Sequence, residues 1–243
     1  MSLAQKALEL DAVAQRVITP YVIVASALGI LAVLVLLSSL PEVDTDQEDE
    51  TVANANTCKT SILQFPHLLL GVLAIFLYVG VEVISVDTII SYGVEQGFSL
   101  EDAKFFFSFT LGAMLVGYLI GIVTIPKILK QDVALKISAV LGVLFSVAAI
   151  LTDGYVSVLF IALLGLANSL MWPAIWPLAI AGLGRFTKIG SSLLIMGIAG
   201  GAIIPLVYGR LTDLADAQQA YWIMVPCYLF IWFFSTKGHR IRK

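Results

Sequence analysis

The chain has 243 residues, of which 59% are hydrophobic and only 13% are charged, and its mean hydropathy is +0.96. A soluble domain of this length would carry about a quarter charged residues to cover its surface, so the composition argues against a soluble protein and predicts a membrane protein. The net charge is only -3, and basic and aromatic residues are not clustered, which argues against nucleic-acid binding.

Seven apolar runs are long enough to cross a bilayer as helices, and they predict an all-α, polytopic membrane helical bundle with seven transmembrane helices. The predicted spans are residues 19–40, 66–91, 105–126, 133–152, 155–180, 189–209 and 219–236. Residues 1–18 form an amphipathic segment with no pattern of a cleavable signal peptide. The acidic, polar segment at 41–65 predicts a flexible linker between the leading helix and a six-helix half-domain at 66–236.

Lysine and arginine predict the orientation, because positive side chains accumulate on the cytoplasmic side of a membrane. One set of connections holds Lys59, Lys127, Lys130, Lys136, Arg185, Lys188, Lys237, Arg240, Arg242 and Lys243. The opposite set holds only Lys6, Arg16, Lys104 and Arg210. We therefore expect the linker and the basic tail at 237–243 to be cytoplasmic and the segment 1–18 to be extracytoplasmic.

Prolines predict bent helices in the last three spans, since each removes an intrahelical hydrogen bond. These residues are Pro173, Pro177, Pro205 and Pro226. Bent helices are characteristic of membrane bundles that rock around a central site. Glycines four residues apart, in the sequences GYLIG and GIAGG, predict close contact between helix backbones.

Glu82 lies about midway along its predicted span, where a lone carboxylate costs several kcal/mol unless it is neutral, paired or facing water. Tyr78 lies four residues before it and Ser85 three residues after it, so the three share one helix face. This polar stripe predicts a wet cavity in which Glu82 binds a polar substrate or exchanges a proton. The alternative is a protonated Glu82 that only links two helices.

Asp87 follows Glu82 by five residues, which turns it about 140 degrees away on a helix. The two carboxylates are therefore not expected to act as an acid and base pair. Because Asp87 lies nearer the outer end of its span, we expect it to reach interfacial water or to cap a neighbouring helix. Asp87 and Ser85 are secondary candidates for the site.

Asn168, Trp172 and Trp176 are spaced by four residues, so an unbroken helix would present an amide and two indoles on one face. An amide that donates and accepts, flanked by flat apolar rings, suits the hydroxyl edge and the CH-rich face of a pyranose. The alternative is that the tryptophans belong to an aromatic belt at the membrane interface.

Neither a metal site nor enzymatic chemistry is expected. His67 and His239 have no metal-ligating partner at helical spacing, and Cys58 and Cys227 lie far apart. The sequence contains no nucleophile and base arrangement and no phosphate-cradling glycine loop. No cofactor is therefore predicted.

Three stretches together resemble the carboxy-terminal half of a bacterial hexose transporter. They are FLYVGVEVISVDTIISYG, GYLIGIVTIPKILKQDVALKISAVLG, and the long run from GLANSLMWPAIWP to LVYGRLTD. The chain is similar in these stretches to the fucose:proton symporter branch of the major facilitator superfamily, and within it to glucose/galactose transporters. The resemblance runs from about Thr19 to Phe234.

The resemblance implies a twelve-helix fold in two halves, of which the helix at 19–40 would be the sixth. It implies a multi-pass protein of the bacterial inner membrane whose partners are a hexose, protons and lipid. Glu82 and Asn168 match positions expected to face sugar, with Tyr78, Trp172 and Trp176 as neighbours. Proton coupling is implied by family membership alone, because the carboxylates linked to it lie in the amino-terminal half of the family's fold.

Half a transporter would expose its cavity-lining residues to lipid, which is expensive. We therefore expect a fragment of a longer transporter, a chain that pairs with a separate amino-terminal half, or one that self-associates; the first is favoured. A receptor-like or other non-transporting membrane protein is the competing hypothesis, although no lysine lies in the middle of a span and the linker after the first helix is long.

Overall fold

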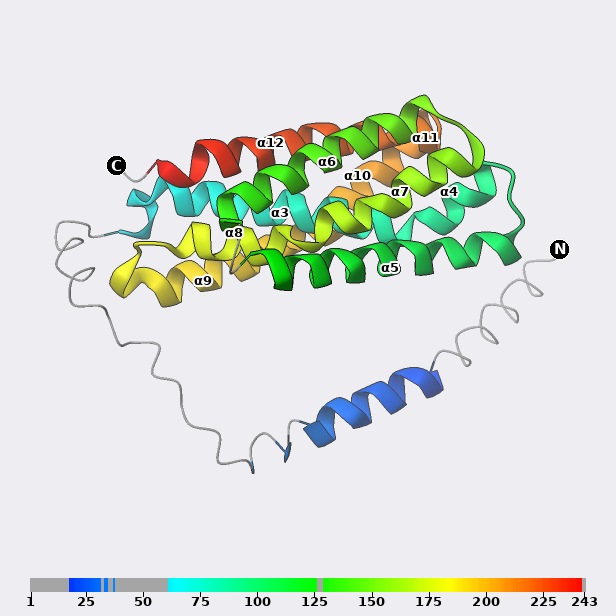
Figure 1. Ribbon diagram of the computed structural model, residues 1–243. Coiled ribbons are helices and arrows are strands. Elements are labelled where there is room, and N and C mark those ends of the chain that lie inside the picture. Colours follow the sequence, from blue (N-terminus) through cyan, green and yellow to red (C-terminus); the bar gives the residue numbers. More distant parts are fainter. Residues whose placement is uncertain (1–17, 32, 35–36, 38–60, 126–128, 242–243) are drawn as a thin grey trace. The chain divides into compact units, whose positions relative to one another are not determined.

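The computed structural model of the protein describes residues 18–31, 33–34, 37, 61–125 and 129–241 (Figure 1). Contacts divide the chain into two units, Met1–Gln47 and Glu48–Lys243, which we describe separately. In the first unit, the described residues include an apolar helix, Ile18–Leu31. Apart from Ile18 and residues 61–65, the predicted amphipathic segment and the predicted linker lie outside the described residues.

The second unit is a bundle of helices, and its described residues contain no strand. Its first part consists of η1 (Ile62–Gln64), α3 (Pro66–Asp87), α4 (Ile89–Glu95), α5 (Leu100–Thr124), α6 (Gln131–Leu151), α7 (Gly154–Ser169) and α8 (Met171–Ile180). Its second part consists of η2 (Gly184–Phe186), α9 (Thr187–Met196), η3 (Gly197–Ala199), α10 (Gly200–Leu214), α11 (Ala217–Ala220), η4 (Tyr221–Ile223), α12 (Met224–Thr236) and η5 (Gly238–Arg240). The all-α bundle expected from the sequence is confirmed.

Five helical segments of the described chain are long and apolar enough to cross a membrane. They are Pro66–Asp87, Leu100–Thr124, Gln131–Leu151, Gly154–Ile180 and Gly184–Leu214, and each corresponds to one predicted span. The other two predicted spans correspond to shorter pieces. The described part of the leading one is Ile18–Leu31, and the last is divided among α11, η4 and α12.

The bundle brings helices that are distant in sequence side by side. The most extensive contacts join α5 to α7, α7 to α6, α6 to α12, and α3 to α10 (Figure 1). The helix α3 also touches α8 and α12, so it lies at the centre of the bundle and presents Glu82 there.

Three of the transmembrane segments are interrupted. The segment after Gly154 breaks at Leu170, three residues before Pro173, whose missing N–H and bulky ring disfavour a bond to the Ser169 carbonyl. The segment ending at Leu214 contains a 3-10 turn, η3, and Pro205 lies within α10. Prolines therefore account for the first break, as predicted.

The break after α3 has no proline. Thr88 lies between α3 and α4, and its hydroxyl donates to the Ile84 carbonyl at 2.7 Å. The Tyr221 hydroxyl lies 2.8 Å from the Thr88 Oγ1 and completes this link. A threonine that bonds back to a preceding carbonyl bends a helix, and the predicted span 66–91 accordingly divides in two.

Glycines allow the closest helix contacts. A Cβ at Gly200 would clash with the carbonyl of Phe76, and one at Gly197 would crowd the carbonyl of Val72, so the GIAGG sequence lies against the backbone of α3. In the same way, a Cβ at Gly117 would clash with Ser169, which explains the tight contact of α5 with α7. Both glycine motifs therefore lie at helix contacts, as the spacing predicts.

Gly200→Ala should lower the free energy of unfolding by about 1 to 3 kcal/mol, because overpacking a tight contact costs that much and the obstacle here is backbone. The free energy of unfolding is measured by unfolding each variant in mixed micelles with an increasing detergent fraction. Gly209→Ala is the matched control in the same helix, since nothing lies within 4 Å of its added Cβ. Equal losses in the two variants would contradict the packing described for α3 and α10.

Candidate functional site

Glu82 and Tyr78 form a hydrogen-bonded pair on α3. The Tyr78 hydroxyl donates to Glu82 Oε1 at 2.6 Å, and the two residues lie one helical turn apart. Tyr78 is buried, whereas Glu82 is partly exposed. The pair exists because an i, i+4 spacing on a helix brings two side chains within reach of each other.

The indoles of Trp172 and Trp176 continue this surface along α8. Trp172 lies 6.3 Å from the Tyr78 ring between centroids, and it stacks on Trp176 at 5.7 Å with an interplanar angle of 24°. Both indoles are partly exposed. Carboxylate, phenol and two indoles thus follow one another across α3 and α8.

A groove of about 450 Å³ lies beside the two indoles. It is lined by Trp172, Pro173, Trp176, Pro177 and Ile195. The indoles and prolines come from α8, and Ile195 comes from α9, so the groove lies at the surface shared by these helices. Its walls are mostly apolar, and Trp172 connects them to Tyr78, which is bonded to Glu82.

Asn168 is not among the residues that line the groove. It is completely buried near the end of α7, where its Nδ2 donates to Ser85 Oγ at 3.1 Å. Its Oδ1 accepts from the Tyr228 hydroxyl at 2.9 Å, and Ser85 Oγ donates in turn to the backbone carbonyl of Glu82 at 2.8 Å. The amide is therefore tied to α3 and α12.

The spacing of four residues between Asn168 and the tryptophans does not produce a single face. An unbroken helix would align them, but the chain breaks at Leu170 between α7 and α8. Asn168 consequently faces α3, while Trp172 and Trp176 line the groove. The structure brings Tyr78, Glu82 and the indoles together. Asn168 instead contacts Ser85 of α3 and Tyr228 of α12.

Asp87 is exposed at the last position of α3. It makes no hydrogen bond or ion pair within the described part of the chain, and α4 begins without a side-chain cap. It shares no contact with the pair formed by Tyr78 and Glu82. The angular separation expected between the two carboxylates is thus present.

Two tyrosines near the site were not singled out from the sequence. Tyr228 on α12 reaches Asn168, and Tyr118 on α5 is partly exposed and interacts electrostatically with Glu82. Each is a single tyrosine in an apolar run, so only the tertiary contact distinguishes it. Among the described residues, no group of three or more His, Cys, Asp or Glu side chains could hold a metal ion.

No family model matches the chain. Among curated proteins, it is 32% identical over 233 residues to the glucose/galactose transporter of Brucella abortus biovar 1, covering 95% of this chain and 55% of the relative. It is 28% identical over 221 residues to the L-fucose-proton symporter of Escherichia coli K12, covering 89% of this chain and 50% of the relative. The chain thus spans about half the length of the curated relatives it matches.

A solved structure supports the same relationship. The crystal structure of the major facilitator superfamily transporter FucP in the outward conformation matches with a TM-score of 0.76 and 26% sequence identity. The match covers 98% of this chain and 58% of that one. The resemblance expected from the sequence is confirmed: this multi-pass membrane protein has the fold of a major facilitator superfamily transporter, and its homologues are glucose/galactose transporters and L-fucose-proton symporters.

Proposed function

We propose that the chain supplies one half of a secondary-active hexose transporter that works by alternating access and couples sugar movement to protons. The observation that carries this proposal is the chain of contacts that runs from Glu82 through the buried Tyr78 to Trp172 and Trp176, the two indoles that line the apolar groove. The relatives named as glucose/galactose transporters and L-fucose-proton symporters support the choice of a hexose and of protons.

The chemistry of this surface suits a pyranose. The flat indoles of Trp172 and Trp176 pack against the CH-rich face of the ring, and a carboxylate accepts from the hydroxyls on its edge. Glu82 Oε1 already accepts from Tyr78. Glu82 Oε2 has no hydrogen bond within the described residues, so it is the oxygen that we assign to a sugar hydroxyl.

Asn168 and Ser85 support the site from behind, because both are completely buried and bonded to each other. Direct contact of Asn168 with sugar, which the family resemblance predicts, requires a second conformation in which α7 moves relative to α3. Asp87 remains a prediction as a residue of the outer entrance, with its exposure in support.

Interrupted helices support alternating access. The break at Thr88 lies in the segment of Glu82, and the break at Leu170 lies in the segment of the indoles. Discontinuous membrane helices around a central site are typical of transporters whose parts rock against one another. Thr88 and Leu170 are therefore the points at which we expect α3 and α7 to change direction during transport.

The groove also needs a covering surface. A partly exposed carboxylate such as Glu82 is expensive to leave in lipid, and the chain spans about half of its relatives. We propose that an amino-terminal half, on the same or another polypeptide, closes the cavity over Glu82 and the indoles. Self-association is the alternative arrangement.

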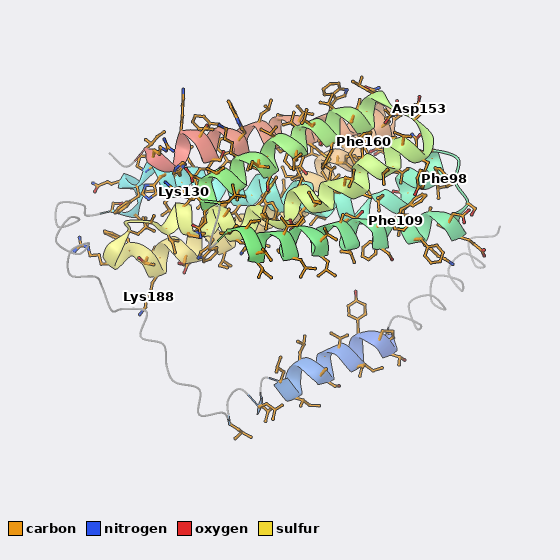
Figure 2. All side chains as sticks on the ribbon, in the orientation of Figure 1. Phe98, Phe109, Lys130, Asp153, Phe160 and Lys188 are labelled. Carbon is orange, nitrogen blue, oxygen red and sulfur yellow. The ribbon has the colours of Figure 1, made fainter. Side chains whose placement is uncertain are left out.

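The proposed orientation places the carboxy terminus in the cytoplasm of a bacterial inner membrane. Lys130 and Lys188 lie toward one end of the bundle, and Phe98 and Asp153 lie toward the other (Figure 2). Because positive side chains favour the cytoplasmic side, the end with the lysines is assigned to the cytoplasm.

Uptake of labelled sugar tests the half-transporter directly. In a transport-deficient strain, the chain expressed with the amino-terminal half of the Brucella abortus relative should accumulate labelled D-galactose or D-glucose. Neither half should do so when expressed without the other, because the cavity then has one wall only. Uptake by this chain in the absence of an amino-terminal half would contradict the need for a covering half.

Glu82→Gln should reduce hexose accumulation by about tenfold or more in that paired system, because a hydrogen bond to a charged group is worth about 1.5 to 3 kcal/mol. Amounts of protein in the membrane should stay equal. Glu95→Gln, which changes an exposed glutamate on α4, is the matched control and should transport normally. Normal uptake by the Glu82 variant would overturn the assignment of the site.

A further inference from the structure

We propose that Tyr228 of α12 is a positioning residue for the Glu82 site, acting through a relay of buried hydrogen bonds. The relay runs from the Tyr228 hydroxyl to Asn168, from Asn168 to Ser85, and from Ser85 to the backbone carbonyl of Glu82. This inference rests on the proposed function of Glu82 in sugar binding.

Tyr228 is held in one place by its surroundings. Its side chain is completely buried, and its ring lies against Gly142 of α6, where any Cβ would clash with the ring carbons. Because Gly142 has no side chain, the Tyr228 ring fits between α6 and α12. A ring enclosed in this way holds its hydroxyl 2.9 Å from the Asn168 Oδ1.

The direction of the relay follows from counting protons. Ser85 has one hydroxyl proton and donates it to the Glu82 carbonyl, so it must accept from the Nδ2 of Asn168. The Oδ1 of Asn168 then faces Tyr228 and needs a donor, which the phenol supplies at 2.9 Å. All members of the relay are satisfied in only this orientation of the amide.

Removing the phenol proton would release that orientation. With phenylalanine at position 228, a flipped Asn168 amide would let Ser85 donate to Oδ1, and the Glu82 carbonyl would lose the hydrogen bond from Ser85. Hydrogen bonds from serine side chains to nearby backbone carbonyls compete with the bonds of a helix and change its local geometry. The backbone of α3 at Glu82 is therefore coupled to a hydroxyl that belongs to α12.

The geometry of the site makes this coupling important. Glu82 must keep its direction relative to Tyr78, whose hydroxyl lies 2.6 Å from Oε1, and to the indole of Trp172 beyond it. Small errors in the placement of a binding group cost affinity, and residues that lock its orientation are part of a working site. Tyr228 fulfils this role without touching the groove.

The test uses the full chain in lipid nanodiscs, with dicyclohexylcarbodiimide as the probe and mass spectrometry to locate the modified carboxyl. Two values are measured: the labelling rate at Glu82 without sugar, and the concentration of D-galactose, D-glucose or L-fucose that halves this rate. Glu82→Gln identifies the signal. Tyr92→Phe is the matched control, because it removes another buried phenol, bonded to Ser157 away from the site.

Tyr228→Phe should change the labelling rate severalfold and raise the half-protecting hexose concentration by about tenfold, which is the scale of one lost buried hydrogen bond. Tyr92→Phe should match the parent in both values. Ser85→Ala should reproduce the Tyr228→Phe effect, and Tyr228→Phe added to Ser85→Ala should change nothing further, because both interrupt one relay.

Parent-like values for Tyr228→Phe, or effects that add fully with Ser85→Ala, would overturn the relay. An equal effect of Tyr92→Phe would do the same, since it would show only the general cost of a lost phenol. If the hexoses protect Glu82 in no variant while Tyr228→Phe still alters the labelling rate, the relay stands and sugar binding by this half fails.

Discussion

A carboxyl group within a membrane helix is the constraint on which the rest of the structure depends. Tyr78 stabilises Glu82 by donating to it from the preceding turn, and the partly exposed carboxyl needs the cavity that we propose a second half encloses. Its other oxygen lacks a bond among the described residues, and it is the oxygen that we propose accepts from a sugar hydroxyl. The aromatic surface of Trp172 and Trp176 extends from the same pair and gives that group an apolar wall.

The breaks in the helices and the polar contacts depend on each other. The break at Leu170 turns Asn168 inward to meet Ser85 and Tyr228, while it leaves the indoles at the groove. At the break after α3, the Thr88 hydroxyl bonds to the Ile84 carbonyl and lies within hydrogen-bond distance of the Tyr221 hydroxyl. Polar side chains thus occupy the places where α3 and α7 depart from regular geometry, and they join helices that we propose move relative to one another during transport.

Much of the fold could be predicted from hydropathy, and its departures have physical causes. The span predicted to begin at residue 105 begins at Leu100 in the structure, where Ser99 caps the helix. Because Glu101 and Asp102 in its first turn are charged, the apolar run begins later than the helix does. Proline marked the break near Pro173, but nothing in the local pattern marked the one at Thr88. The stripe of Tyr78 and Glu82 was visible as a helical spacing, whereas the role of Tyr228 depends on contacts across three helices that no spacing records.

The central claim is that the surface of Glu82 and the two indoles binds a hexose, and intrinsic fluorescence measures it most directly. The chain has four tryptophans, so Trp222→Phe with Trp232→Phe leaves only Trp172 and Trp176 as reporters. In the complex with an amino-terminal half whose tryptophans are replaced by phenylalanine, our account predicts a saturable change in their emission with D-galactose or D-glucose, and loss of that change with Glu82→Gln. Emission that is unaffected by either sugar, or an unchanged response in the Glu82 variant, would contradict the account.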